Sequence, residues 1–272
     1  MLAFTDTHCH LNLAQYDSDR ETVLNHAWQA GLVLILNPGI DLKTSQEAIK
    51  LAKAYPDRIY AAVGIHPNYG NSWTPVTLDA LREQAQDSVV VAIGEIGLDY
   101  YRQYTAFNQQ HTIFETQLKL ATELALPVII HNRESTSDLM DILSNWHRGL
   151  VRSGNPLSER PGVLHSYSAD LSTAQAAIEM NFYIGISGPV TFTNAPDRKS
   201  IIKDLPLESL LLETDAPFLT PHPHRGKRNE PAFIPLIADE IARLHNTNPK
   251  RIAEITYANA CKLFRLKASH NP

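Results

Sequence analysis

The sequence predicts an α/β fold and, within that class, a (β/α)8 TIM barrel. Short, continuously apolar runs alternate with amphipathic segments, which is typical of parallel strands joined by crossover helices. About eight such alternations fit into 272 residues, a length near the usual size of this barrel. A doubly wound open sheet is the competing fold, but no Gly-x-Gly-x-x-Gly motif follows the first expected strand.

The expected strands are short apolar runs that end in a turn or at a polar side chain. Residues 33–36 illustrate this, because the run Val-Leu-Ile-Leu is followed directly by Asn-Pro-Gly. In chain order, we expect strands at residues 2–8, 33–36, 59–65, 89–93, 127–131, 162–165, 182–186 and 210–213.

Helices are expected between these strands, where apolar residues recur every three to four positions. In the first of them, Leu24, Ala27 and Trp28 recur in this way, and Gly31 is a stop signal. The expected helices are residues 17–30, 42–54, 76–85, 104–124, 136–150, 171–180, 230–245 and 249–264.

The composition is that of an ordinary globular protein, with 43% hydrophobic and 19% charged residues. A formal net charge of −5 excludes a global basic field, although a local patch or bound cations can still hold phosphates. Cys9 and Cys261 form neither a zinc motif nor a disulfide framework, which favours the reducing cytoplasm. We expect no signal peptide and no membrane span.

We assign residues 1–272 to one domain, which we expect to be a monomer or a weak oligomer. Residues 152–161 are polar and rich in Pro, Ser and Gly. We interpret them as a surface insertion rather than a linker between domains, because apolar runs continue on both sides.

His8 and His10 are the first candidate metal ligands. In an extended chain, side chains alternate between faces, so both imidazoles point to one side and Cys9 points to the other. Neighbouring imidazoles suit zinc and other divalent transition metals. Further histidines and carboxylates follow other apolar runs: His66, Glu95, His131, His165, Glu213 and Asp215. Because the carboxyl ends of barrel strands meet on one face, we expect these side chains to converge.

Each of these residues alone is better explained as a loop residue or a cap, and only their recurrence on one face favours a metal site. The candidate ligands are His8, His10, Glu95, His131, His165 and Asp215. They exceed one tetrahedral zinc site and indicate two divalent cations, either Zn²⁺, Mn²⁺ or Mg²⁺, bridged by Glu95. Such a pair with a bridging water suits hydrolysis at phosphorus, with Glu213 or Asp215 handling protons.

Basic and aromatic residues follow several of these candidate ligands and favour an anionic substrate. Arg133 lies two positions after His131, and Tyr101 and Arg102 follow Glu95. Arginine forks match phosphate oxygens, and tyrosine rings can stack on bases. Any one of them is equally well explained as a solvated charge or an aromatic ring at the edge of the core.

At this point the sequence resembles the TatD family of metal-dependent deoxyribonucleases over nearly its whole length. The matching motifs are Asp6-Thr7-His8-Cys9-His10-Leu11, Gly64-Ile65-His66-Pro67, Gly94-Glu95-Ile96-Gly97-Leu98-Asp99, His131-Asn132-Arg133, His165-Ser166-Tyr167, Glu213-Thr214-Asp215-Ala216-Pro217 and Arg228-Asn229-Glu230-Pro231. The resemblance implies a barrel of the metal-dependent hydrolase type, a divalent-metal site on the six candidate ligands, and hydrolysis of DNA phosphodiester bonds.

Similar proteins are exonucleases that trim single strands, so the resemblance implies 3′–5′ exonuclease-like action on single-stranded DNA. Some members of the family act as endonucleases. Glu213 and His66 match family positions linked to catalysis and phosphate contact. We expect Glu95, Glu213, Asp215 and His66 to be the catalytic residues. We expect Arg133, Tyr167, Arg228 and His66 to contact the substrate. The insertion at residues 152–161 is longer than in typical members, which leaves the substrate preference open but not the chemistry.

Two other functions remain open from the sequence. A related barrel hydrolase would cleave small esters, lactones, amides or phosphotriesters, but such enzymes often carry a carbamylated lysine where this chain has Glu95, and residues 94–98 contain no lysine. A metal-binding scaffold without activity is the other alternative, and an intact ligand set without hydrolysis under any divalent metal would support it.

Overall fold

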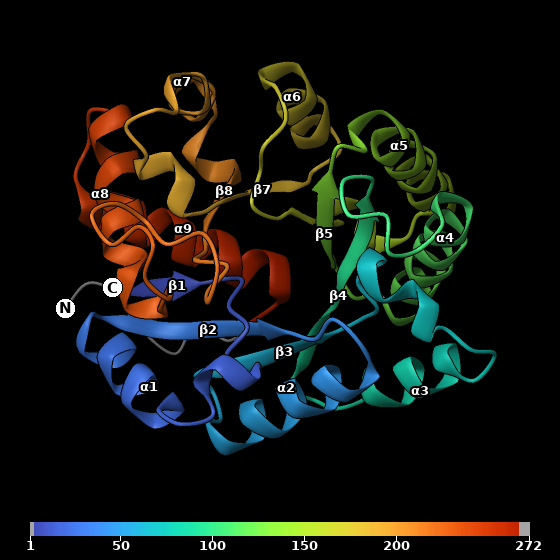
Figure 1. Ribbon diagram of the computed structural model, residues 1–272. Coiled ribbons are helices and arrows are strands. Elements are labelled where there is room, and N and C mark those ends of the chain that lie inside the picture. Colours follow the sequence, from blue (N-terminus) through green and yellow to red (C-terminus); the bar gives the residue numbers. More distant parts are fainter. Residues whose placement is uncertain (1–2, 267–272) are drawn as a thin grey trace.

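The computed structural model describes residues 3–266 and confirms the expected barrel (Figure 1). Eight strands form one parallel sheet in the order β1 to β8, so each strand pairs with its neighbours in the sequence. The strands are β1 (Phe4–Asp6), β2 (Leu32–Pro38), β3 (Ile59–Val63), β4 (Val90–Asp99), β5 (Val128–Arg133), β6 (Gly162–Leu164), β7 (Tyr183–Ile186) and β8 (Leu210–Leu212).

Helices surround this sheet on its outer side (Figure 1). The α-helices are α1 (Arg20–Gln29), α2 (Leu42–Ala54), α3 (Thr77–Gln84), α4 (Phe107–Leu124), α5 (Thr136–Ser153), α6 (Leu171–Glu179), α7 (Pro196–Asp204), α8 (Ile234–Leu244) and α9 (Pro249–Phe264). The short 3-10 helices are Ala14–Tyr16, Pro67–Ser72, Pro156–Glu159, Gly188–Thr191, Leu207–Ser209 and Pro231–Phe233. Within residues 3–266, every helix is too short or too polar to cross a bilayer.

The barrel closes where the chain after β1 meets the chain after β8. The amide of Thr7 donates to the carbonyl of Leu212 at 2.9 Å, and the amide of Asp215 donates to the carbonyl of His8 at 2.8 Å. The amide of His10 then donates to the carbonyl of Ala216, also at 2.8 Å. This seam brings candidate ligands from the two ends of the sequence to the same edge of the barrel.

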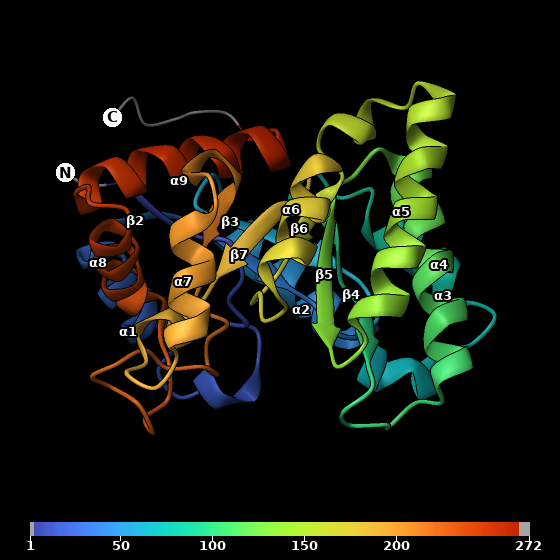
Figure 2. The ribbon, with the colours of Figure 1, turned by 90° about the horizontal axis from the view of Figure 1, so that it is seen from above.

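Apolar side chains fill the barrel and close its amino-terminal end. Leu36, Ile129 and Leu211, from different strands, form one buried cluster with Leu263 and Phe264 of α9. Figure 2 shows α9 lying across one end of the barrel, opposite the loops that follow β1, β4 and β8. Because α9 covers this end with apolar side chains, polar chemistry is confined to the other face.

β4 is longer than expected, and Glu95 lies inside it rather than after its end. Gly97 pairs with His131 of β5, and Asp99 pairs with Arg133, which extends β5 past its expected end. Gly97 has a φ of +146°, and an added Cβ would lie only 2.0 Å from the carbonyl oxygen of His131. A glycine therefore allows the two strands to continue side by side at the level of the candidate ligands.

Residues 152–161 form a surface segment, with half of them exposed, but buried side chains anchor it to the barrel. Arg160 is 7% exposed, and its guanidinium donates to the carbonyls of Leu263 at 3.0 Å and Ala125 at 2.9 Å. The segment leads into the start of β6, so it lies at the amino-terminal end of the barrel. The candidate ligands lie at the opposite end of the barrel, so the structure places this segment away from them.

Two further differences concern the element boundaries. The first strand was expected to start at Leu2, which lies outside the described residues, and β1 ends at Asp6, so His8 and His10 follow the strand. The helix α7 has no counterpart among the expected helices, because its only buried residue is Ile202 and it lacks an apolar stripe.

Candidate metal centre

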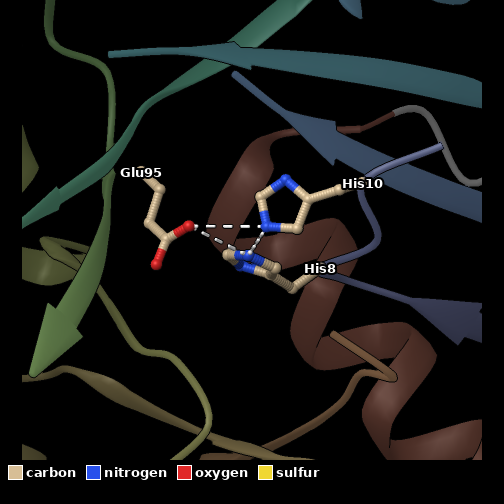
Figure 3. A group of neighbouring side chains, drawn as sticks. All are labelled: His8, His10 and Glu95. Carbon is tan, nitrogen blue, oxygen red and sulfur yellow. Dashed lines mark hydrogen bonds and ion pairs between the residues drawn. The ribbon is translucent and has the colours of Figure 1, made fainter. Parts of the chain in front are cut away.

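Glu95 lies at the centre of the candidate site, and its two carboxylate oxygens face different histidines. Oε2 lies 3.5 Å from Nε2 of His8 and 3.5 Å from Nε2 of His10. Figure 3 shows these three side chains pointing toward one another from β4 and from the segment after β1. Oε1 lies 2.9 Å from Nδ1 of His131 and 3.1 Å from Nε2 of His165. The carboxylate thus divides the histidines into two sets.

The set around Oε2 also includes Asp215. Its Oδ1 lies 3.8 Å from Nε2 of His8 and 3.7 Å from Nε2 of His10, and those two nitrogens are 3.0 Å apart. A tetrahedral site with bonds of about 2.1 Å separates neighbouring ligand atoms by about 3.4 Å. Glu95, His8 and His10 therefore have the spacing of ligands around one divalent cation, and Asp215 lies beside the two histidines.

Hydrogen bonds behind the rings determine which histidine nitrogen carries a lone pair. Nδ1 of His10 lies 3.2 Å from the carbonyl oxygen of Pro38, which can only accept, so Nδ1 carries the proton. Nε2 of His10 is then free to bind a metal. The side of His131 that faces away from Glu95 meets Oδ2 of Asp99 at 3.3 Å. Such outer partners orient metal-binding imidazoles and raise their basicity.

His165 also has a carboxylate behind its ring, that of Glu213, in an ion-pair contact. Nδ1 of His165 lies 3.4 Å from Oε1 of Glu213, and the amide of Ser166 donates to the same oxygen. Glu213 is fully buried. Its carboxylate packs against Gly185, where a Cβ added to the glycine would lie only 2.4 Å from Oε2 of Glu213. Glu213 therefore lies behind His165, away from the space between the ligands.

His66 differs from the other histidines because its neighbour fixes the opposite tautomer. The amide of Asn68 donates to Nδ1 of His66 at 3.0 Å, so a neutral ring carries its proton on Nε2. Burial lowers the pKa of His66 to about 3 and keeps the ring neutral. Nε2 lies 3.5 Å from Oε1 of Glu95, so His66 presents a hydrogen-bond donor to the site.

The electrostatics of the site favour bound cations. Burial by itself raises the pKa of the Glu95 carboxyl, but the surrounding histidines, His66 and His165 foremost, outweigh burial and hold that pKa well below its usual value. Burial lowers the pKa of His165, yet the charges and hydrogen bonds of Glu95 and Glu213 together outweigh burial and raise the pKa well above its usual value. Nε2 of His165, which faces Glu95, thus attracts either a proton or a metal ion. A metal ion that binds there would release the proton.

Three overlapping groups of His and Glu side chains have nitrogen or oxygen atoms within 4.8 Å of one another, close enough for the atoms of each group to share an ion. They are His8, His10 and Glu95; His8, His165 and Glu213; and His66, Glu95 and His131. Their mixture of imidazole nitrogens and carboxylate oxygens matches what divalent transition metals bind in hydrolases. The donor set, the spacing around Oε2 and the outer partners of the rings fit such an ion.

Comparison with known families identifies this arrangement. The profile of a family described as TatD related DNase matches residues 5–265. The chain belongs to this TatD family. It is therefore a metal-dependent hydrolase, in line with the resemblance seen in its motifs.

Curated relatives of this TatD protein match it from end to end. It is 41% identical over 261 residues to "Uncharacterized metal-dependent hydrolase YabD" of Bacillus subtilis, covering 96% of this chain and 98% of the relative. It is 34% identical over 268 residues to "3'-5' ssDNA/RNA exonuclease TatD" of Salmonella typhimurium, with the same coverage of both chains.

Solved structures agree with this family assignment. The TatD homologue YJJV from Escherichia coli has a TM-score of 0.88 and 32% identity, with 97% of this chain and 98% of that chain covered. A phosphotriesterase homology protein from Escherichia coli shares the fold alone, with a TM-score of 0.67, 11% identity, and 97% and 98% coverage.

The structure places the expected substrate residues of this TatD protein differently. Arg133 is exposed at the end of β5, and its guanidinium lies 4.1 Å from the centre of the Tyr101 ring. Tyr167 is buried, and its hydroxyl donates to the carbonyl of Asp170 at 2.5 Å. The guanidinium of Arg228 donates to both carboxylate oxygens of Asp19, at 2.9 and 2.6 Å. Of the three, Arg133 is the most exposed, and it lies at the end of β5, two residues after His131.

The sequence patterns did not assign a role to two buried carboxylates that support the ligands. Asp6 of β1 accepts hydrogen bonds from the amides of His8 at 3.2 Å and Thr214 at 2.9 Å, and so joins both sides of the barrel seam. Asp99 accepts from the amides of Tyr101 and Arg102 in addition to its contact with His131. A carboxylate inside an otherwise apolar strand is the signal that indicates such residues.

Proposed function

We propose that the protein is a deoxyribonuclease that removes nucleotides from the 3′ end of single-stranded DNA, using two divalent cations and an activated water. The observation that carries this proposal is the division of the histidines by Glu95, with His131 and His165 at one oxygen and His8 and His10 at the other. One carboxylate between two sets of nitrogens supports two cation positions. The names of the exonuclease relatives support the substrate class and the polarity.

Each cation position would be held by a separate set of side chains, with Glu95 shared. His8, His10 and Asp215 would hold one ion, and His131 and His165 would hold the other. Zn²⁺, Mn²⁺ and Mg²⁺ are the candidates. Divalent ions in such a site polarise a phosphoryl oxygen and make water a stronger nucleophile at neutral pH.

The protein's own side chains would position the scissile phosphate. The protonated Nε2 of His66 can donate to a phosphoryl oxygen, because Nδ1 is engaged by the amide of Asn68. Arg133 would add a charged donor from the rim, with its guanidinium plane fixed over the ring of Tyr101. His66 lies at the same oxygen of Glu95 as His131, and Arg133 lies two residues after His131 in β5.

Asp215 rather than Glu213 would transfer the proton. The side chain of Asp215 is 14% exposed, so water and substrate can reach its carboxylate. Glu213 is fully buried, with Oε1 against His165 and the amide of Ser166. Glu213 would therefore hold His165 in position, and Asp215 would accept a proton from the attacking water.

We place this activity in the cytoplasm. The free thiols of Cys9, which is buried, and of Cys261, which is partly buried, suit a reducing compartment.

The test is the hydrolysis of end-labelled single-stranded DNA by metal-stripped protein to which Mg²⁺, Mn²⁺ or Zn²⁺ is returned in turn. We expect stepwise shortening from the 3′ end that requires a metal and is lost in His8→Ala. Metal binding without cleavage of DNA, accompanied by rapid turnover of a lactone or a small ester, would instead identify a hydrolase of small substrates.

A further inference from the structure

Among the described residues, the most exposed aromatic side chains all lie on the face of the barrel that carries the candidate metal centre. They follow β3, β4 and β8 and are Tyr69, Tyr101, Tyr104, Phe107 and Phe218. Exposed rings gathered at one site indicate a surface that binds a ligand with apolar faces. Cations held by the candidate metal centre would bind an anionic group. The molecule that binds this surface must therefore combine an anionic group with apolar faces.

Two of these rings contact the candidate metal centre directly. The ring of Tyr69, 43% exposed, lies 6.2 Å from the ring of His66, centre to centre, at an angle of 79°. The ring of Phe218, 49% exposed, lies 6.3 Å from the ring of His10 at an angle of 69°. Both are edge-to-face contacts, which fix the position of a ring and leave part of it open.

These two rings contact histidines that face different oxygens of Glu95. The partner of Tyr69 is His66, whose Nε2 lies 3.5 Å from Oε1 of Glu95. The partner of Phe218 is His10, whose Nε2 lies 3.5 Å from Oε2. Tyr69 follows β3 and Phe218 follows β8, so an anion bound over Glu95 would have one open ring on each side.

We propose that Tyr69 and Phe218 stack on the two bases that flank the scissile phosphate, one ring to each base. This inference rests on the proposed function and specifies how the same site recognises its substrate. Stacking on an aromatic ring accepts every base, because each base has a π-face. Bases inside a duplex are covered by their neighbours, so this arrangement selects single strands with splayed ends.

The test combines ring removal with base removal. Tyr69→Ala and Phe218→Ala are compared with wild type in binding a single strand whose 3′-terminal linkage is a phosphorothioate, which slows cleavage. The strand is used intact, or with an abasic residue at the terminal or the penultimate position. We expect each alanine variant to bind the intact strand about 5- to 100-fold more weakly. The loss should vanish on the strand that lacks the matching base.

Matched variants separate stacking from damage to the metal centre. Tyr69→Phe and Phe218→Tyr retain the rings and should bind as wild type does. Val151→Ala removes an exposed apolar side chain, 56% exposed, from α5 near the opposite end of the barrel and should have no effect. The metal content of all variants should equal that of wild type, because neither ring supplies a ligand.

The outcomes distinguish this inference from the proposed function. Cleavage of DNA by wild type together with unchanged affinity in both alanine variants would overturn the inference and leave the function standing. Base-dependent binding through the rings without cleavage under any metal would support the stacking surface and refute the nuclease. A loss of affinity that persists on the abasic strands, or self-association that disappears in the variants, would show that the rings serve another contact.

Discussion

Oδ2 of Asp99 lies 3.3 Å from Nε2 of His131, on the side of the ring that faces away from Glu95. Asp99 is buried, and it also accepts hydrogen bonds from Nδ2 of Asn68 at 2.9 Å and from the amide of Tyr101 at 3.0 Å. Burial raises the pKa of the Asp99 carboxyl, but the contact with His131 and the hydrogen bonds from the Arg102 amide and from Asn68 outweigh burial and lower it. Asp99 therefore holds a negative charge against His131 and directs Nδ1 toward the cation position.

Replacement of Asp99 by Asn should weaken metal binding without loss of a ligand. Asn retains an acceptor for the loop amides but loses the charge behind His131, so we expect a 10- to 100-fold drop in affinity for Zn²⁺, about what other outer partners contribute. Competition with a chelating dye measures this. Asp197→Asn, an exposed carboxylate on α7, is the control, and equal affinities in the two variants would contradict the positioning role.

Replacement of Arg133 should weaken substrate binding and leave metal binding unchanged. Its guanidinium is exposed and fixed over Tyr101, so we expect Arg133→Ala to raise the KM for single-stranded DNA by a factor of about 10 to 100, the range for a hydrogen bond to a charged group. Steady-state kinetics alongside metal titration decide this. A parallel fall in metal affinity would count against phosphate contact, and Arg148→Ala, on α5, is the control for charge.

Arg228 is expected to act on stability rather than on the substrate. It donates to both oxygens of Asp19 and lies 4.6 Å from the centre of the Tyr16 ring, and this ties the loop after β8 to the segment before α1. Arg228→Ala should lower the midpoint of urea unfolding and leave the KM for DNA within about twofold of wild type. A large rise in KM with unchanged stability would restore the substrate role that the motif implies.

Arg160 provides a test at the end of the barrel opposite the candidate metal centre. Its guanidinium satisfies the carbonyls of Leu263 and Ala125, so Arg160→Met should leave both without these partners and destabilise the fold by about 1–3 kcal/mol. Urea unfolding measures this loss. The kcat/KM for DNA should not change, and a shift in substrate preference would show that residues 152–161 influence the site after all.

Local patterns were sufficient to predict most of the fold. Continuous apolar runs indicated each strand, and α2 (Leu42–Ala54) begins and ends where its periodicity predicts, with Asp41 and Thr44 forming a capping box. The extension of β4 past Glu95 could not be predicted, because it depends on pairing between Gly97 and His131 across two strands. Alternation placed His8 and His10 on one side, although both lie beyond β1.

The residues around the ligands were harder to predict, because their roles depend on partners far away in the sequence. Arg228 follows Asp215 closely and is typical of a phosphate-binding residue, yet its partner Asp19 lies 209 residues away. Glu213 resembles a catalytic carboxylate until its burial behind His165 is seen. Asp6 belongs to a matching motif but supports the seam of the barrel, a role that no spacing indicates.

The central claim is that two cations share the carboxylate of Glu95, and metal stoichiometry tests it most directly. Metal-stripped protein would be titrated calorimetrically with Zn²⁺ and with Mn²⁺, and the metal retained after dialysis would be measured by mass spectrometry. We predict two ions per chain in wild type, and at most one in Glu95→Gln, whose amide keeps the shape and removes the charge. One ion per chain in wild type, or two ions retained by Glu95→Gln, would contradict the shared carboxylate.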